Sequence, residues 1–270
     1  MAAGDPDAEM IVRESTTGMV VFQKLGRVLS LAGHEDLVDY RSPRGPGAQA
    51  LIADEVGRLG DQESFSFDSL PASARDLFCS ALDSMDLAYL AEEHTTSAVL
   101  DLPDSFDAYL ASLSKKERHE MRRKQRRYES VVGPTLFKRE TENGGLFEQF
   151  VLLHRRSPGS KGQFMTPDKE AYFKSLLELP GWAIDALVDE SGAMMAAGFG
   201  YFDETGYYLY NSTYDPAHSE ASPGMVLLGL LIELNIERRS PVFDFLKGDE
   251  HYKYRLGAQP RSLYRVSSTA

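Results

Sequence analysis

The C-terminal third of the chain contains the pattern that most restricts the fold. Two turn-like sequences, Asp-Glu-Ser-Gly at 189–192 and Asp-Glu-Thr-Gly at 203–206, separate three short apolar or aromatic segments, at 183–188, 193–202 and 207–213. Because Asp and Gly favour tight turns, the three segments are predicted to form an antiparallel meander. The middle segment is rich in Ala and Gly, which indicates that a large group packs against it or approaches its backbone closely.

An apolar helix and one more strand are predicted after the meander. Residues 225–236 are strongly apolar and polar mainly at Glu233 and Asn235, as expected of a buried helix. Residues 241–246 form a short apolar segment, and the order strand–helix–strand predicts that it runs parallel to 207–213. The chain is therefore predicted to have an α/β fold with a mixed sheet.

Helix and strand patterns also occur earlier in the chain. Asp104 is predicted to cap a short helix, and Ser-Lys-Lys-Glu at 114–117 has the form of a capping box, so a second helix is expected there, ending near residue 129. Cys79 is expected to be a packed, unreactive thiol and His154 a packed or capping side chain. The remaining predicted elements are a bent strand pair at 18–31, helices at 48–59, 73–82, 144–156, 168–179 and 248–255, and strands at 99–103 and 262–266.

Composition excludes several classes of protein. One cysteine among 270 residues allows no intrachain disulfide, which favours a cytoplasmic location. The six histidines lack the spacing of metal ligands, so no metal site is expected. The longest apolar run, residues 225–232, is far shorter than the ~20 residues of a membrane span. The first ten residues lack the basic and apolar regions of a signal peptide.

Charge is concentrated in one basic segment. Residues 115–127 hold eight basic and two acidic side chains, a net +6; because the whole chain carries −12, the remainder carries −18. A mostly acidic surface repels polyanions, so the segment indicates a local anion site rather than a DNA-binding or RNA-binding coat. Arg118, Arg122 and Arg126 recur every four residues, where like charges destabilise an isolated helix. Two interpretations stay open: a solvated face paired with acidic surface, or a ligand site.

The start of the predicted apolar helix has the features of an anion site. Ser222 is a good N-cap, and Pro223 suits the first helical position because its missing N–H costs nothing there. Gly224, Met225 and Val226 are then expected to present free backbone N–H groups, with no side chain on Gly224 to block close approach. A helix start of this kind after a strand is a natural phosphate site.

Several ordered motifs carry a family resemblance. They are Leu-Ala-Gly at 31–33, Asp-Tyr at 39–40, Leu-Pro-Asp-Ser-Phe-Asp-Ala-Tyr-Leu at 102–110, the basic run at 116–127, Phe-Met-Thr-Pro at 164–167, Ser-Pro-Gly at 222–224 and Asp-Phe-Leu-Lys-Gly-Asp-Glu-His-Tyr-Lys at 244–253. With these motifs the chain resembles the CelD-like branch of the GNAT acyltransferase superfamily, which is associated with cellulose and exopolysaccharide genes. The resemblance implies a tandem double-GNAT architecture, with a GNAT-like half-domain at 1–97 and an acyltransferase domain at 98–270. Since only about thirty residues precede Leu-Ala-Gly, the first half is expected to be shortened.

The resemblance also implies a binding mode for an acyl-CoA co-substrate. The pantetheine arm of acetyl-CoA or another acyl-CoA is expected between the splayed strands 207–213 and 241–246. Backbone N–H groups near Tyr210 and Asn211 would polarise the thioester carbonyl. The pyrophosphate would lie on Ser222, Gly224 and Met225. Lys253 is a further residue expected to bind the cofactor.

Catalytic and acceptor-binding residues follow from the same resemblance. Asp244 is the first candidate for the base, with Asp249 and Glu250 behind it, and Tyr252 is the candidate acid for the departing thiolate. The alternative for Asp244 is a strand-end residue that orders the following turn, and for Tyr252 it is core packing. The residues expected to bind an anionic acceptor, such as a nucleotide-sugar, are Arg122, Arg126 and Arg255.

The predicted function is acyl-CoA-dependent N-acyltransfer, of the acetyltransferase type, to an amine or hydroxyl of a sugar or cell-envelope or exopolysaccharide precursor. Two alternatives stay open. One is a Fem-type ligase, a related double-GNAT group that transfers amino acids from aminoacyl-tRNA to peptidoglycan precursors; the acidic remainder of the chain argues against so large an RNA partner. The other is a non-catalytic partner of a polysaccharide synthase that keeps the GNAT fold.

Overall fold

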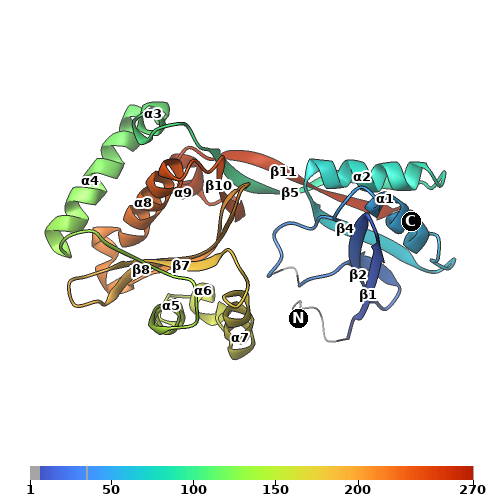
Figure 1. The fold of residues 1–270 in the computed structure, drawn as a ribbon, viewed down its shortest axis with the longest axis horizontal. Helices are drawn as coiled ribbons and strands as arrows, with labels where there is room; N and C mark the ends of the chain where they lie inside the picture. Colours follow the sequence, from blue (N-terminus) through green and yellow to red (C-terminus); the bar gives the residue numbers. More distant parts are fainter. Residues whose placement is uncertain (1–6, 35, 270) are drawn as a thin grey trace. The chain divides into compact units, whose positions relative to one another are not determined.

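The computed structural model describes residues 7–34 and 36–269 and divides into two compact units. One unit consists of the chain up to Ser97 together with the segment from Pro260 onward, and the other spans Ala98–Gln259. Strand β5 (Tyr89–Asp101) runs across the boundary between them. Figure 1 shows both units.

The first unit is a small mixed sheet with two helices. Its strands are β1 (Glu9–Ser15), β2 (Gly18–Leu25), β3 (Val28–Leu31), β4 (Ser64–Leu70) and β11 (Gln259–Ser268), in the order β1-β2-β3-β4-β11. These pairs are antiparallel except β3–β4, which is parallel. The helices α1 (Ala48–Val56) and α2 (Ala72–Asp83) confirm two predicted elements. Strand β4 was not predicted, although Ser-Phe-Ser-Phe at its start alternates as a strand does.

The core of the first unit is aromatic. Phe67 of β4 packs against Phe22, Phe65 and Phe78, with ring centroids 4.5–6.0 Å apart. Phe22, Phe67 and Phe78 are fully buried, and Phe78 holds α2 on the sheet, while Ile52 of α1 joins the same core. Cys79 is half-buried on α2 at the edge of this core, where the sequence places a packed thiol.

The second unit contains most of the helices and the longer strands. In chain order after β5 they are α3 (Phe106–Ser112), α4 (Lys115–Val131), β6 (Leu136–Glu140), α5 (Gly145–Arg155), α6 (Ser160–Phe164), α7 (Pro167–Leu176), β7 (Trp182–Val188), β8 (Met194–Asp203), β9 (Gly206–Tyr214), the short 3₁₀ helix η1 (Pro216–Ala221), α8 (Pro223–Glu237), β10 (Val242–Lys247) and α9 (His251–Arg255).

The sheet of the second unit has the order β10-β9-β8-β7-β6. Strands β7, β8 and β9 form an antiparallel meander, and β10 joins β9 in parallel, so both predictions are confirmed. Helices α5, α6 and α7 lie on one face of this sheet, whereas α8, α9, α3 and α4 lie on the other (Figure 1). Each face of the sheet is thus covered, which explains why β7 and most of β8 are buried.

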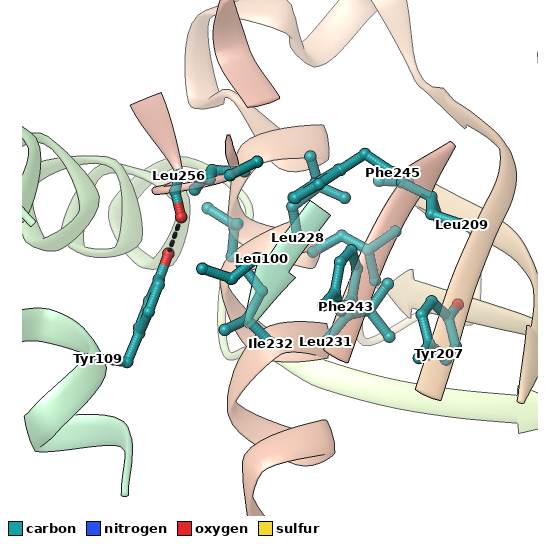
Figure 2. Close-up of a cluster of buried hydrophobic side chains, with 14 of the residues drawn as sticks. Leu100, Tyr109, Tyr207, Leu209, Leu228, Leu231, Ile232, Phe243, Phe245 and Leu256 are labelled. Carbon is teal, nitrogen blue, oxygen red and sulfur yellow. Dashed lines mark hydrogen bonds between the residues drawn. The ribbon is translucent and has the colours of Figure 1, made fainter. Parts of the chain in front are cut away.

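Helix α8 fills the centre of the second unit. It is apolar on nearly all sides because one side packs on the sheet while the other meets α3 and α4. Figure 2 shows Leu228, Leu231 and Ile232 of α8 against Tyr207 and Phe243 of the strands. At the edge of this core the hydroxyl of Tyr109 donates a hydrogen bond of 3.0 Å to the carbonyl of Leu256.

A buried cluster of polar side chains links strands β6, β7 and β9. Asp185 of β7 is fully buried and accepts hydrogen bonds from both Arg139 of β6 (2.5 and 2.8 Å) and the hydroxyl of Tyr207 of β9 (2.8 Å). The ring of Tyr207 lies close over Gly200 of β8, where an added Cβ would be 2.3 Å from the tyrosine oxygen. The close approach predicted for the Ala- and Gly-rich segment is therefore confirmed.

The caps of α3 and α4 show one prediction confirmed and one wrong. Ser114 accepts a hydrogen bond of 3.2 Å from the N–H of Glu117, which confirms the capping-box start of α4. Helix α3 is capped by Ser105, which accepts from the N–H of Ala108 (3.2 Å), and not by Asp104. Ser105 takes the role because it lies one residue closer to the first helical turn.

Candidate active site

Strands β9 and β10 are joined only at their beginnings. Within the described residues their parallel register consists of two pairs, Phe243 with Tyr207 and Asp244 with Tyr208. Strand β9 nevertheless continues to Tyr214 and β10 to Lys247. The carboxyl-terminal parts of the two strands therefore run on without a shared register, as expected of the splayed strands that the family resemblance implies.

A β-bulge lies in β9 just beyond this point. The register of β8 and β9 passes from Phe199–Asn211 directly to Gly200–Leu209, so Tyr210 is one residue too many. In a regular strand neighbouring side chains point to opposite faces, but a bulge changes this alternation and re-aims the backbone. Accordingly Tyr210 and Asn211, although adjacent, both reach the side of the sheet covered by α5 and α7.

The contacts of these two residues fix the bulge. The ring of Tyr210 packs against Phe173 of α7 and Trp182 of β7, with centroids 5.2 and 5.3 Å away. The side-chain oxygen of Asn211 lies 3.1 Å from Nε2 of His154 on α5. Contacts with α5, α7 and β7 thus fix both side chains, and these contacts also fix the backbone of β9 at the bulge.

His154 is a neutral, buried imidazole. Its side chain is 1% exposed and contacts the rings of Phe150 and Phe164. Burial, together with the nearby ammonium of Lys161, lowers the pKa of His154 to about 4, so the ring is uncharged at neutral pH. Nδ1 of this ring is buried without a hydrogen-bond partner among the described residues. The prediction that His154 is a packed side chain is confirmed.

The end of β10 is held by Asp244. Its side chain is almost fully buried, and Oδ1 accepts a hydrogen bond of 2.8 Å from the N–H of Leu246. Leu246 has φ +60°, a left-handed conformation that residues other than Gly, Asn and Asp rarely adopt. The carboxylate of Asp244 thus stabilises the unusual backbone that ends the strand. This contact matches the alternative in which Asp244 orders the turn.

Lys253 of α9 holds the same turn from the other side. Its side chain is 3% exposed, and the ammonium is surrounded by backbone carbonyls and one carboxylate. The acceptors are the carbonyls of Lys247 (2.7 Å), Gly248 (3.2 Å) and Leu246 (3.4 Å) and the carboxylate of Glu250 (2.9 Å). The ammonium is therefore directed into the chain's own turn.

The other residues predicted near β10 have diverse settings. Tyr252 packs edge-on against Phe245, and its pKa is raised by burial and by the charge of Glu250, so its hydroxyl stays protonated at neutral pH. Asp249 and Glu250 are exposed beside it. Arg255 donates a hydrogen bond of 3.0 Å to the carboxylate of Glu117, which ties α9 to the first turn of α4.

The start of α8 lies beside the end of β9. Gly224 is next to the ring of Tyr214, which an added Cβ would meet at 3.4 Å. Pro223 occupies the first turn as predicted. Ser222 occupies the N-cap position, as predicted, but its backbone is left-handed (φ 54°, ψ 46°) and its side chain makes no capping hydrogen bond.

The amide groups of α8 also differ from the prediction. The N–H groups of Met225 and Val226 both donate to the carbonyl of Ser222, at 3.0 and 3.2 Å. The carbonyl of an N-cap residue accepts the first hydrogen bonds of its helix, so two of the three amides expected to be free are already bonded. Of the three amides, that of Gly224 makes no such bond to Ser222.

A cleft lies between α4 and α8, closed at one end by α3. We call it the α4–α8 cleft; its volume is about 530 Å³. The residues that line it are Phe106, Leu110, Met121, Arg122, Lys124, Gln125, Arg126, Thr135, Met225, Val226, Gly229, Leu230 and Glu233. The part of its lining that comes from α8 is thus mostly apolar, whereas α4 contributes three cationic side chains. The structure brings Arg122 and Arg126 together with Met225 in this cleft, although the sequence assigned them to different ligands.

Two absences concern the part of the chain that the structure describes. In residues 7–34 and 36–269, no group of three His, Cys, Asp or Glu side chains is arranged to hold a metal ion. Over the same residues, every helix is too short or too polar to cross a membrane.

Comparison with known proteins identifies the family of the chain. The model of the family described as "Acetyltransferase (GNAT) domain" matches residues 115–254, more than half of the chain. The chain belongs to the GNAT family. The α/β, GNAT-like fold predicted from the sequence is therefore confirmed. The matched region of this GNAT domain begins at α4 and includes the bulge, the start of α8 and Lys253. No curated protein sequence matches the chain.

Solved structures share the fold of this GNAT protein. L-PGS from Bacillus licheniformis is 14% identical, with a TM-score of 0.69 over 97% of this chain and 84% of that chain. The C-terminal domain of a putative lysylphosphatidylglycerol synthetase from Agrobacterium fabrum is 13% identical, with a TM-score of 0.65 over 98% and 84%. FemX is 10% identical, with a TM-score of 0.63 over 96% and 87%. Such low identities establish a common fold and nothing more.

Sequence reasoning missed two features of the GNAT site. The bulge at Tyr210 depends on which residues of β8 and β9 face each other, and no turn residue marks it. The contact between His154 and Asn211 joins residues 57 positions apart. The α4–α8 cleft had a weak signal, because Gly229 interrupts the apolar helix on the face of Met225.

Proposed function

We propose that this GNAT domain is an acyl-CoA-dependent acyltransferase. The observation that carries the proposal is the bulge at Tyr210, which lies just past the last register pair of β9 and β10 and on the strand that leads to α8. A thioester placed there has its carbonyl beside the backbone amides of Tyr210 and Asn211. The acceptor that we propose is an amine or hydroxyl of a sugar or of a cell-envelope or exopolysaccharide precursor, as the resemblance to the CelD-like branch implies.

The proposed reaction is direct transfer. The acceptor nitrogen or oxygen attacks the thioester carbonyl, and the oxyanion of the tetrahedral intermediate is stabilised by backbone N–H groups at the bulge; loss of one such donor typically costs about 10²–10³ in rate. The C–S bond then breaks. Tyr252, which is protonated at neutral pH, gives its proton to the thiolate. The acceptor's proton passes to a carboxylate, and the diphosphate of the co-substrate lies near Gly224.

Among the carboxylates, we propose Asp249 as the base that an acceptor reaches. Asp244 is buried and bonded to the N–H of Leu246, whereas Asp249 is exposed at the end of β10. Glu250 lies next to it and contacts Lys253. Asp244 and Lys253 act by holding the backbone of β10 in place and are positioning residues in this proposal.

Aminoacyl transfer from tRNA is the second candidate, because the fold is shared with FemX and with L-PGS. It differs from the first candidate in its dependence on salt. Binding that neutralises many phosphates weakens about 10³-fold or more between 50 and 200 mM salt, whereas a small co-substrate with few phosphates responds much less. A third candidate, a non-catalytic partner of a polysaccharide synthase, predicts that neither ligand is turned over.

Calorimetric titration with acetyl-CoA tests the proposal. Wild type is expected to bind, and Gly224→Trp is expected to lose at least tenfold in affinity, because the indole would fill the space in front of the Gly224 amide. The added Cβ itself makes ordinary contacts with Tyr214, so the variant is expected to fold. Gly145→Trp is the matched control: it also lies in the first turn of a helix, and its Cβ meets nothing within 4 Å.

The possible results separate the candidates. Absence of acetyl-CoA binding by wild type, or equal loss in both tryptophan variants, contradicts the acyl-CoA proposal. Binding of an aminoacylated tRNA with a steep salt dependence, and no binding of acetyl-CoA, favours the second candidate instead.

A further inference from the structure

We propose that the α4–α8 cleft binds the nucleotide end of the acyl-CoA, with its 3′-phosphate on Arg122 and Arg126. The inference rests on the proposed function and extends it to a second subsite on the same co-substrate. It starts from the cleft itself, whose volume of about 530 Å³ lies within the range of small-ligand pockets, roughly 300–1,000 Å³.

The ion pairs of α4 single out the cationic side chains that face the cleft. Three arginines of the helix are engaged with the protein. Arg123 makes a two-point contact with Glu120 (2.8 and 2.9 Å), Arg127 contacts Glu220 (3.3 Å), and Arg118 donates to carbonyls at the end of α3. These contacts account for the part of the basic segment that serves as an ordinary solvated face.

The cationic side chains on the cleft have a different environment. Within the described part of the chain, Arg122, Lys124 and Arg126 make no ion pair or hydrogen bond with the protein, and all three line the cleft. Arg122 and Arg126 lie four residues apart on one face of the helix and repel each other, a repulsion that a bound anion offsets. Lys124 already interacts electrostatically with the carboxylates of Glu117 and Glu120. Arginine is well suited to this role because its planar guanidinium binds phosphate oxygens in pairs.

The apolar wall of the cleft suits a flat ring system. Met225, Val226 and Leu230 form it from the side of α8, and Gly229 between them carries no side chain. A glycine inside a helix costs about 1 kcal/mol relative to alanine, and here an added Cβ would meet the end of Met121 at 3.2 Å. The missing side chain therefore lets Met121 of α4 pack closely against α8, so that both helices contribute to the apolar wall.

The position of the cleft connects it with the start of α8. Met225, which lines the cleft, directly follows Gly224, where the proposed function places the diphosphate. In CoA the nucleoside is attached directly to that diphosphate, so the nucleotide end has the cleft within reach. Glu233 lines the cleft eight residues along α8, about 12 Å away, and its carboxylate is an acceptor for an amino group rather than for a phosphate. The cleft thus offers guanidinium groups for the phosphate and a carboxylate for the exocyclic amine of a 3′-phosphorylated adenosine.

Dephospho-CoA provides the probe, because it differs from CoA only by the 3′-phosphate. Calorimetric titrations with both ligands are compared for wild type, one double variant and one control variant. The salt concentration is about 0.15 M, at which charge interactions are screened beyond about 8 Å. Wild type is expected to bind CoA at least tenfold more tightly than dephospho-CoA. The double variant Arg122→Ala/Arg126→Ala is expected to lose this preference while its affinity for dephospho-CoA stays within about threefold of wild type.

The matched control is Arg123→Ala/Arg127→Ala, which removes the same charge from the neighbouring row of the same helix and is expected to keep the preference. If wild type binds CoA but the preference persists in Arg122→Ala/Arg126→Ala, or is lost equally in the control, the inference is overturned while the proposed function stands. If wild type binds neither ligand, both fail. Binding of phosphatidylglycerol vesicles that requires Arg122 and Arg126, without any preference for CoA, also overturns the inference and assigns the cleft to a lipid.

Discussion

Replacement of Lys253 by methionine is the most direct test of how the end of β10 is built. Methionine keeps most of the side chain's apolar length, so the variant removes the ammonium while largely preserving the packing. The structure directs that ammonium to three backbone carbonyls and one carboxylate, all within 3.4 Å. The variant therefore separates a role within the turn from a role in binding a ligand phosphate.

The expected cost follows from the individual contacts. A hydrogen bond to a charged group contributes roughly 1.5–3 kcal/mol, and the two short ones, to the carbonyls of Lys247 (2.7 Å) and Gly248 (3.2 Å), count most. Both residues are half-buried, so water partly replaces the lost donors and the lower end of the range applies. The exposed Glu250 adds little. We expect Lys253→Met to lower the free energy of unfolding by about 3 kcal/mol.

Urea denaturation followed by circular dichroism measures this difference, with Lys174→Met as the control. Lys174 is exposed in the last turn of α7, and its replacement should change the free energy of unfolding by no more than about 0.5 kcal/mol. If Lys253→Met is as stable as wild type to within about 0.5 kcal/mol, the structural role is refuted. A stable variant with weakened CoA binding would instead restore the role of phosphate ligand predicted from the sequence.

Three further predictions concern buried groups of the second unit. Asp185→Asn leaves the largely buried Arg139 without its counter-ion and should lower the free energy of unfolding by about 3 kcal/mol in urea titrations, whereas a change below 1 kcal/mol would contradict the cluster. Gly200→Ala places a Cβ 2.3 Å from the hydroxyl oxygen of the buried Tyr207 and should cost about 1–3 kcal/mol; an unchanged melting temperature would argue against this contact. The pKa of His154 is about 4 in the folded chain, below its ordinary value of 6.5, so the unfolded chain binds the proton first as the pH falls. The contribution of His154 to the free energy of unfolding is therefore full above pH 6.5 and falls by about 3 kcal/mol as the pH drops to 4. Unfolding titrations should find this loss missing in His154→Gln.

The elements that the sequence predicts well are those with local signals. Helix α4 begins where Ser114 and Glu117 form a capping box, and the meander of β7, β8 and β9 follows from two Asp- and Gly-containing turns. Local signals also explain the parallel pairing of β10, since an apolar helix between two strands allows little else. These features need only neighbouring residues to specify them.

The candidate site was harder to predict from the sequence because its contacts join residues that are far apart in the chain. Serine is a residue type typical of N-caps. Ser222, however, ends η1 and begins α8 with a left-handed backbone, and its side chain makes no capping hydrogen bond. Lysine and aspartate are residue types typical of functional sites, yet Lys253 and Asp244 both form hydrogen bonds with backbone groups at the end of β10. In each case the residue type was informative, and the backbone around it, which no short motif encodes, decided what it contacts.

The extra residue in β9 has a consequence for comparing this chain with others. Every side chain from Asn211 to Tyr214 faces the side that it does because Tyr210 has no opposite number in β8. A homologue with one residue fewer at this point would exchange inside for outside over the rest of the strand and lose the partner of His154. A single-residue gap at position 210 in an alignment would therefore mark a change of architecture at the proposed reaction centre, even where the flanking residues match.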